Sequence, residues 1–225
     1  MRRPYSLWLV LLVCTGLAFW LEGAGRSTRD PFLQAWGLGA ESLAAGYWWT
    51  WLTHAFLHGS WGHAAMNLVS LWVVGRHAVK EWGNTGFVLV LAAAAVAGGL
   101  AQMALTPARG PLSGLAGGVF GLGVATALEW GQRRVAFGVG RWHLFTLRGR
   151  SLGWGVLVAA WLTALAARLW PAALGPVGHA CHAGGALAGA LVVWLGAFSL
   201  ADRRSTAEIP AVRADRFPFD GRNGT

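Results

Sequence analysis

The sequence predicts an all-α, polytopic membrane protein, built as a bundle of six transmembrane helices. Of its 225 residues, 55% are hydrophobic and only 12% are charged, and the mean hydropathy is +0.47. A soluble domain usually carries about a quarter charged residues. The 15 tryptophans and 33 glycines are also typical of helices that cross a bilayer and pack closely.

Six apolar runs are candidates for the transmembrane helices, since a helix needs roughly 20 apolar residues to span a membrane. They cover residues 6–22, 62–76, 86–106, 115–130, 152–170 and 179–200. The first run follows Arg2 and Arg3 and also has the length of a signal peptide. Its bulky Trp8, Phe19 and Trp20 favour a retained first helix instead.

The segments between these runs define the expected domain organisation. The long, tryptophan-rich connection from 23 to 61 is typical of a partly interfacial segment, and residues 131–150 form a basic loop. Residues 201–225 are polar and contain Pro210 and Pro218, which is typical of a disordered tail. We therefore expect one six-helix domain over residues 1–200 and a cytoplasmic tail over residues 201–225.

The basic residues predict the orientation. With a cytoplasmic N-terminus, 14 of the 18 Lys and Arg residues fall inside, and four fall outside: Arg26, Arg29, Arg109 and Arg168. This excess supports cytoplasmic N- and C-termini. Because the basic residues lie in short loops and tails, the lipid bilayer explains the net charge of +9 better than nucleic acid does. Cys14 and Cys181 lie in apolar segments and are expected to be buried thiols.

Polar side chains concentrate in two places within or beside the apolar runs. The first, HAFLHGSWGHAAMN, holds His54, His58, His63 and Asn67. The second, GHACHAGGALAG, holds His179 and His182. Polar groups in a membrane are costly and indicate a functional site by default. His63 and Asn67, four residues apart, share one helix face.

The predicted topology places several of these positions at one depth. The second, fourth and sixth helices all begin on the outer side. His63, Asn67, His182 and the small residue Ala116, near the start of the fourth helix, therefore lie at the same level. This convergence indicates a site open to the outer face.

Other interpretations compete with a hydrolytic site. A single histidine near a helix end often has a structural role only. Four outer histidines could also bind a metal, or a pair could bind haem. However, the only acidic residue in the second, fourth or sixth helix is Glu129, at the opposite end. We therefore expect no metal and no cofactor.

Three motifs resemble those of rhomboid intramembrane serine proteases. HGSWGHAAMN resembles their H-x-x-x-N element, GLAGGVFGL their G-x-S-G segment, and HAGGALAG the H-x-x-G-x-x-x-G of their last core helix. Their order and spacing agree across about residues 45–195. The small six-span architecture also resembles bacterial rhombosortases.

The resemblance implies a rhomboid-like bundle with a Ser–His dyad and no acid. Residue 116 would hold the nucleophile, His182 would be the general base, and His63 and Asn67 would form the oxyanion hole. Four further positions would support the site: Gly114, Gly117, Gly118 and Phe120.

The sequence departs from the family pattern at the nucleophile, because residue 116 is alanine. The loss is either engineered or natural. Alternatively Ser113, in GPLSGL, is the nucleophile in a shifted register, but Phe120 then loses its family position.

The function implied by the resemblance is that of an intramembrane serine endopeptidase. It would cleave membrane-anchored protein substrates near the periplasmic face of a bacterial inner membrane, although Ala116 makes the chain as written inactive. The alternative is an inactive rhomboid-like protein that binds or escorts membrane helices. A transporter or haem carrier is a third possibility.

Overall fold

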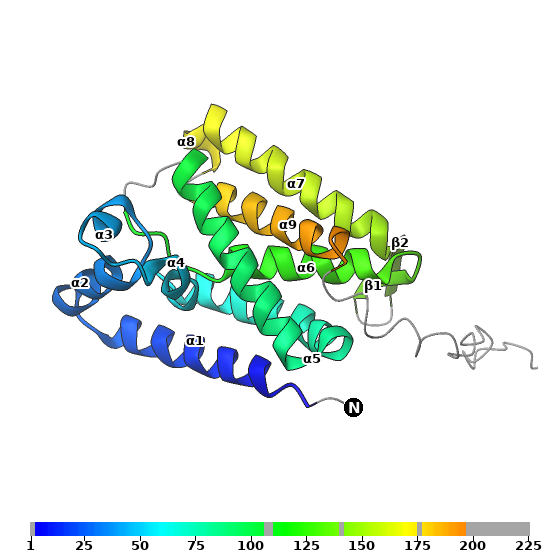
Figure 1. The fold of residues 1–225 in the computed structure, drawn as a ribbon, viewed down its shortest axis with the longest axis horizontal. Coiled ribbons are helices and arrows are strands. Elements are labelled where there is room, and N and C mark those ends of the chain that lie inside the picture. The colour runs from blue at the N-terminus through cyan, green and yellow to red at the C-terminus, as the bar shows by residue number, and fades with distance from the viewer. Residues whose placement is uncertain (1–2, 106–109, 140–141, 175–176, 197–225) are drawn as a thin grey trace, which may run out of the picture.

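The computed structural model describes residues 3–105, 110–139, 142–174 and 177–196, and the fold is a helical bundle (Figure 1). Its helices, in chain order, are α1 (Tyr5–Gly23), α2 (Arg26–Trp36), α3 (Ala40–Ala44), α4 (Thr50–Thr53), the 3-10 helix η1 (His54–Phe56), α5 (Trp61–Leu105), α6 (Ala116–Trp130), α7 (Gly149–Leu169), α8 (Pro171–Leu174) and α9 (His179–Trp194). The two strands are β1 (Arg134–Val139) and β2 (Trp142–Arg148). The expected tail, residues 201–225, lies outside the described residues.

The long helix α5 contains two of the expected spans, 62–76 and 86–106. Its helical geometry breaks at Gly83, which has φ 74° and ψ −177°, a conformation that glycine adopts without strain. The chain folds back at this kink. Gly75 and Phe87, on either side of it, are in contact: a Cβ on Gly75 would lie 3.1 Å from the Phe87 ring. Both spans extend further toward the kink than the hydropathy of the sequence predicted.

The kink also anchors α1 along one side of the bundle. The Asn84 side chain accepts hydrogen bonds from the Ser6 backbone N–H and hydroxyl, at 3.1 and 2.8 Å, and donates to the Arg3 carbonyl. These contacts satisfy backbone groups at the exposed start of α1. Further along, Leu7 packs against Gly75.

Helix α9 packs against α6 by direct backbone contact. A Cβ added at Gly185 would lie 2.0 Å from the Gly117 carbonyl oxygen, and one at Gly189 would lie 2.0 Å from the Gly121 carbonyl oxygen. Only glycine permits this approach, as in other small-residue helix interfaces in membranes. The starts of α6 and α9 are therefore held side by side.

Three helices of the described residues are long and apolar enough to cross a membrane: α1, α5 and α7. Helices α6 and α9 have 15 and 16 described residues. The chain is mostly helical, as predicted, and the count of six spans stays a prediction.

Two segments differ from the sequence prediction. Residues 131–150 were expected to form a loop in an all-α fold, but β1 and β2 pair there as an antiparallel hairpin. The strands are rich in β-branched and aromatic residues, among them Val135, Phe137, Phe145 and Thr146, which favour extended structure. The connection from 23 to 61, whose partly interfacial position stays a prediction, contains four short helices that the sequence did not predict: α2, α3, α4 and η1.

The glycine contact generates a stability prediction. Replacing Gly185 with alanine should push α9 away from α6 and lower the free energy of unfolding by about 1–3 kcal/mol or more, as overpacking does. The matched control is Gly155→Ala in α7, where a Cβ meets no atom within 4 Å. Thermal unfolding in detergent measures both variants; equal midpoints would contradict the close packing of α6 and α9.

Candidate active site

The first turn of α5 carries His63 and is fixed at its start by two hydrogen bonds. The Ser60 hydroxyl accepts from the His63 backbone N–H at 3.3 Å, and the Glu22 carboxylate accepts from the Trp61 N–H at 3.0 Å. Such contacts are typical of helix N-terminal caps. They fix the position of the half-buried His63 ring.

Asn67 lies one turn further along α5 and is 5% exposed. Its side-chain amide donates a hydrogen bond of 3.0 Å to the His63 carbonyl. An amide nitrogen has two hydrogens, so one of them remains for another acceptor. The bond also fixes Asn67 relative to His63.

The loop before α6 packs on the His63 ring. Gly114 has φ +122°, and a Cβ at this position would lie 2.5 Å from His63 Cε1. Its backbone N–H donates to the His54 carbonyl at 2.9 Å. Gly114 is therefore required both for the backbone conformation and for the space that the imidazole occupies.

Ala116 is the first residue of α6 and is half-buried. The first backbone N–H groups of a helix have no intrahelical partner and favour negative charge. Gly117 and Gly118 follow and pack against Cys181 and Leu91 respectively. The start of α6 thus presents backbone donors beside α9.

His182 lies in the first turn of α9, and its imidazole stacks on Phe120 of α6. The two ring centroids are 4.5 Å apart and the planes differ by 5°. Phe120 is one helical turn after Ala116, so the stack places His182 over the face of α6 on which residue 116 lies.

Neighbouring groups hold the start of α9 in place. Gln102 of α5 accepts a hydrogen bond of 3.2 Å from the Cys181 N–H. The His179 ring lies edge-on to His182, with centroids 5.9 Å apart, and its Nε2 lies 3.4 Å from the Leu174 carbonyl. Among the described residues, no three His, Cys, Asp or Glu side chains are arranged to hold a metal ion.

Ser113 lies in the loop before α6, outside the helix. A Cβ at Gly59 would lie 3.9 Å from its hydroxyl oxygen, so Ser113 is close to the loop that precedes α5. In the part of the chain that the structure describes, no hydrogen bond joins Ser113 to His182. The contact between Phe120 and His182 also favours residue 116, rather than Ser113, as the candidate nucleophile position, since Phe120 lies one helical turn after residue 116.

Residues 45–198 match the rhomboid domain family. The chain belongs to the rhomboid family. Together with its apolar helices, this membership identifies it as an integral membrane protein of the class that comprises rhomboid intramembrane proteases and their pseudoprotease relatives.

Two similar proteins carry rhomboid names. The chain is 30% identical over 159 residues to Rhomboid protease GluP of Bacillus subtilis (strain 168), which covers 70% of this chain and 31% of that protein. It is 28% identical over 186 residues to Rhomboid-like protein 11, chloroplastic, of Arabidopsis thaliana, which covers 79% of this chain and 64% of that protein. The chain thus spans less than two thirds of either relative.

Some contacts of the candidate site could not be found from motifs alone. His58 is 2% exposed and lies edge-on to His63, with ring centroids 5.2 Å apart. Glu22, from α1, and the His54 carbonyl help to position His63 and Gly114. The sequence offered one signal, the concentration of histidines at 54, 58 and 63, but not which of them are in contact.

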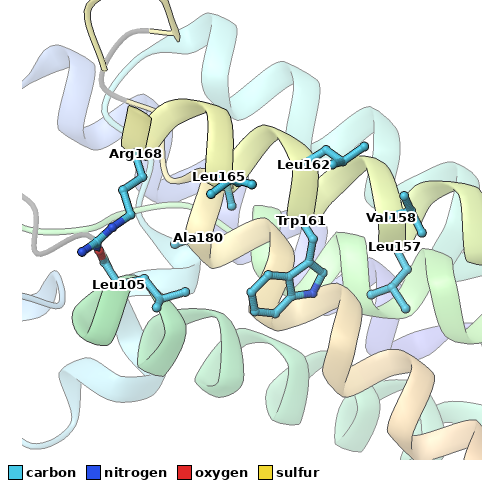
Figure 2. A pocket seen from close by; sticks show the side chains of 9 residues that line it. Leu105, Leu157, Val158, Trp161, Leu162, Leu165, Arg168 and Ala180 are labelled. Carbon is cyan, nitrogen blue, oxygen red and sulfur yellow. The ribbon is translucent and has the colours of Figure 1, made fainter. Parts of the chain in front are cut away.

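An apolar groove lies beside the start of α9 (Figure 2). It has a volume of about 520 Å³ and lies between the end of α5, the second half of α7 and Ala180 of α9. Arg168 is the only charged residue that lines it, and its guanidinium donates to the Leu105 carbonyl. The groove contains none of the candidate catalytic side chains, so it suits an apolar occupant rather than a hydrolytic reaction.

Two histidines that precede α5, His54 in η1 and His58 in the following loop, favour their neutral forms. Burial, and secondly the nearby His63, lowers the pKa of His58 to about 4, and burial lowers the pKa of His54. Neither ring nitrogen of His58 has a hydrogen-bond partner in the described structure. Protonation of His58 would therefore place a charge without a hydrogen-bond partner inside the protein.

This arrangement predicts a pH-dependent stability. An unfolded histidine titrates near pH 6.5, so below that pH the unfolded chain binds a proton that folded His58 excludes. The stabilising contribution should be complete above about pH 6.5 and lost as the pH falls toward 4. Thermal unfolding in detergent across this range measures it, and His58→Gln should reduce the slope. An unchanged slope in that variant would contradict the role of His58.

Proposed function

We propose that the chain is the scaffold of an intramembrane serine endopeptidase that acts on membrane-anchored protein substrates, with residue 116 at the nucleophile position. The observation that carries the proposal is the parallel stack of Phe120 and His182 at 4.5 Å. It supports a register in which the first residue of α6 and the imidazole of α9 face one another. The name of the Bacillus relative, a rhomboid protease, is consistent with this class.

A hydroxyl at residue 116 would give the site a complete mechanism. His182 would take the hydroxyl proton as the oxygen attacks the scissile carbonyl, and would return it to the leaving amine. Water would then hydrolyse the acyl-enzyme, with His182 again as the base. The negative charge that develops on the carbonyl oxygen would be stabilised by N–H groups at the start of α6, together with His63 and Asn67.

Ala116 removes the covalent step and leaves the rest of the arrangement in place. Loss of a nucleophile typically reduces the rate by several orders of magnitude. The chain as written is therefore proposed to be inactive, with the alanine as a substitution of an otherwise complete site. The second candidate, a rhomboid-like protein that binds or escorts membrane helices without cleaving them, is favoured by the alanine itself.

The site is proposed to face the periplasmic side of a bacterial inner membrane. His63, Ala116 and His182 all lie at helix starts, at the end of the bundle opposite the N-terminus of α1 (Figure 1). The excess of basic residues at the N-terminal end supports a cytoplasmic location for that end. Substrate segments would then be cleaved near the outer surface, where water enters.

Restoring the nucleophile tests the proposal. Ala116→Ser should make the purified protein react covalently with a fluorophosphonate probe, whereas the native chain should not. His182→Ala in the serine background should abolish labelling, because no base remains. The control Ser113→Ala should leave labelling intact. Labelling can be followed by mass spectrometry of the modified peptide.

The outcomes separate the two functions. If folded Ala116→Ser protein does not react, the proteolytic proposal is wrong and the binding function is favoured. Labelling of Ser113 in the native chain would show instead that the register is shifted by three residues.

The oxyanion hole gives a separate prediction. In the serine background, Asn67→Ala should lower kcat toward a transmembrane peptide substrate by about 10²–10³-fold, as single donors do. KM should change little, since the donor acts mainly in the transition state. An unchanged kcat in a folded Asn67→Ala variant would remove Asn67 from the oxyanion hole.

A further inference from the structure

The hairpin of β1 and β2 has an apolar face and an opposite face that carries two arginines. Cross-strand partners lie on the same side of a hairpin. The register pairs Val135 with Leu147 and Phe137 with Phe145, and the two phenylalanine rings stack with centroids 4.9 Å apart. Phe145 is 49% exposed, so this apolar face is incompletely covered by the protein.

The opposite face places two arginines against each other. The register pairs Arg134 with Arg148 and Ala136 with Thr146. Like charges directly opposite one another destabilise a strand pair, and an isolated two-stranded hairpin is only marginally stable in water. Among the described residues, no carboxylate forms an ion pair with Arg134 or Arg148, and nothing fully covers Phe145.

The hairpin is joined closely to the ends of two apolar helices. The Gly149 N–H donates to the Arg133 carbonyl at 2.9 Å, and the Arg150 N–H donates to the Gly131 carbonyl at 2.8 Å. These bonds fix the base of the hairpin at the end of α6 and the start of α7 (Figure 1). Because α7 is long and apolar enough to cross a membrane and begins directly after the hairpin, the hairpin is expected at the level of a bilayer surface.

The same end of the bundle is strongly basic. Arg133 pairs with Glu81 beside the kink of α5, at 3.2 Å, and His77 contacts Trp130 at the end of α6. These contacts bring the basic residues of the kink next to the hairpin. In the described structure this end carries two carboxylates, Glu81 and Glu129, and the following basic residues: Arg3, Arg76, Lys80, Arg133, Arg134, Arg148 and Arg150.

We propose that this hairpin is an interfacial anchor that binds an anionic bilayer surface. The apolar face of Val135, Phe137, Phe145 and Leu147 enters the boundary between headgroups and acyl chains. Arg134 and Arg148 bind lipid phosphates, which relieves their mutual repulsion. Aromatic and arginine side chains are well suited to this boundary. The proposal is independent of the proteolytic function.

Site-specific fluorescence in reconstituted protein tests the anchor. Cys14 and Cys181 are buried, so a single thiol introduced by Phe145→Cys can be labelled with an environment-sensitive dye. In nanodiscs that contain phosphatidylglycerol, the dye should emit at shorter wavelength and be quenched by brominated acyl chains. In purely phosphatidylcholine nanodiscs both effects should be much weaker. A dye at Thr146→Cys, on the opposite face, should be quenched less by the bromines.

Two charge variants determine the source of the effect. Arg134→Gln with Arg148→Gln should weaken the phosphatidylglycerol dependence by about fivefold per arginine. The matched control, Arg26→Gln with Arg29→Gln, removes equal charge at the other end and should leave the dependence unchanged. Circular dichroism confirms that each variant is folded.

Three results would overturn the proposal. The first is emission typical of water from the Phe145→Cys dye in both lipids. The second is equal quenching at Phe145→Cys and Thr146→Cys. The third is a response to added RNA in phosphatidylcholine nanodiscs that exceeds the response to phosphatidylglycerol, which would assign the basic end to nucleic acid.

Discussion

The candidate site depends on the direct contact between the backbones of α6 and α9. Gly185 lies against Gly117, and Gly189 lies against Gly121, at distances that leave no room for a side chain. This contact brings the first turns of the two helices together, so that His182 stacks on Phe120 near residue 116. Where lipid surrounds the helices, such packing replaces the hydrophobic effect as the force that holds them together. The position of His182, the proposed base, therefore depends on Gly185, which lies about one turn further along α9 and has no side chain.

The two ends of the bundle have different chemistry. One end carries His54, His58, His63 and His182. It is fixed by backbone N–H groups that donate to the Glu22 carboxylate, the Ser60 hydroxyl and the His54 carbonyl. The other end carries the kink at Gly83, the hairpin and most of the described basic residues. The histidine end suits the proposed bond cleavage, and the basic end suits the proposed contact with anionic lipid. The same arrangement of helices would separate these two proposed roles.

The sequence predicted the long apolar helices, because hydropathy is a local property. The spacing of its motifs also singled out the candidate histidines. It did not predict the hairpin, which depends on the register that pairs Phe137 with Phe145, nor the short helices between 26 and 56. The contact of His58 with His63 and the support from Glu22 depend on tertiary packing between segments far apart in the chain. The roles of Ala116, His182, His63 and Asn67 remain proposals, as do six spans and a domain that ends at residue 200.

A crystal structure of the Ala116→Ser variant tests the central claim most directly. The account predicts that the introduced hydroxyl lies about 2.6–3.2 Å from a ring nitrogen of His182, within hydrogen-bond reach of a base. It also predicts that Phe120 stays stacked on the imidazole and that Gly185 stays against Gly117. The dyad would be contradicted if α6 and α9 stay in contact but the hydroxyl and the imidazole lie too far apart for a direct hydrogen bond or one bridged by a single water.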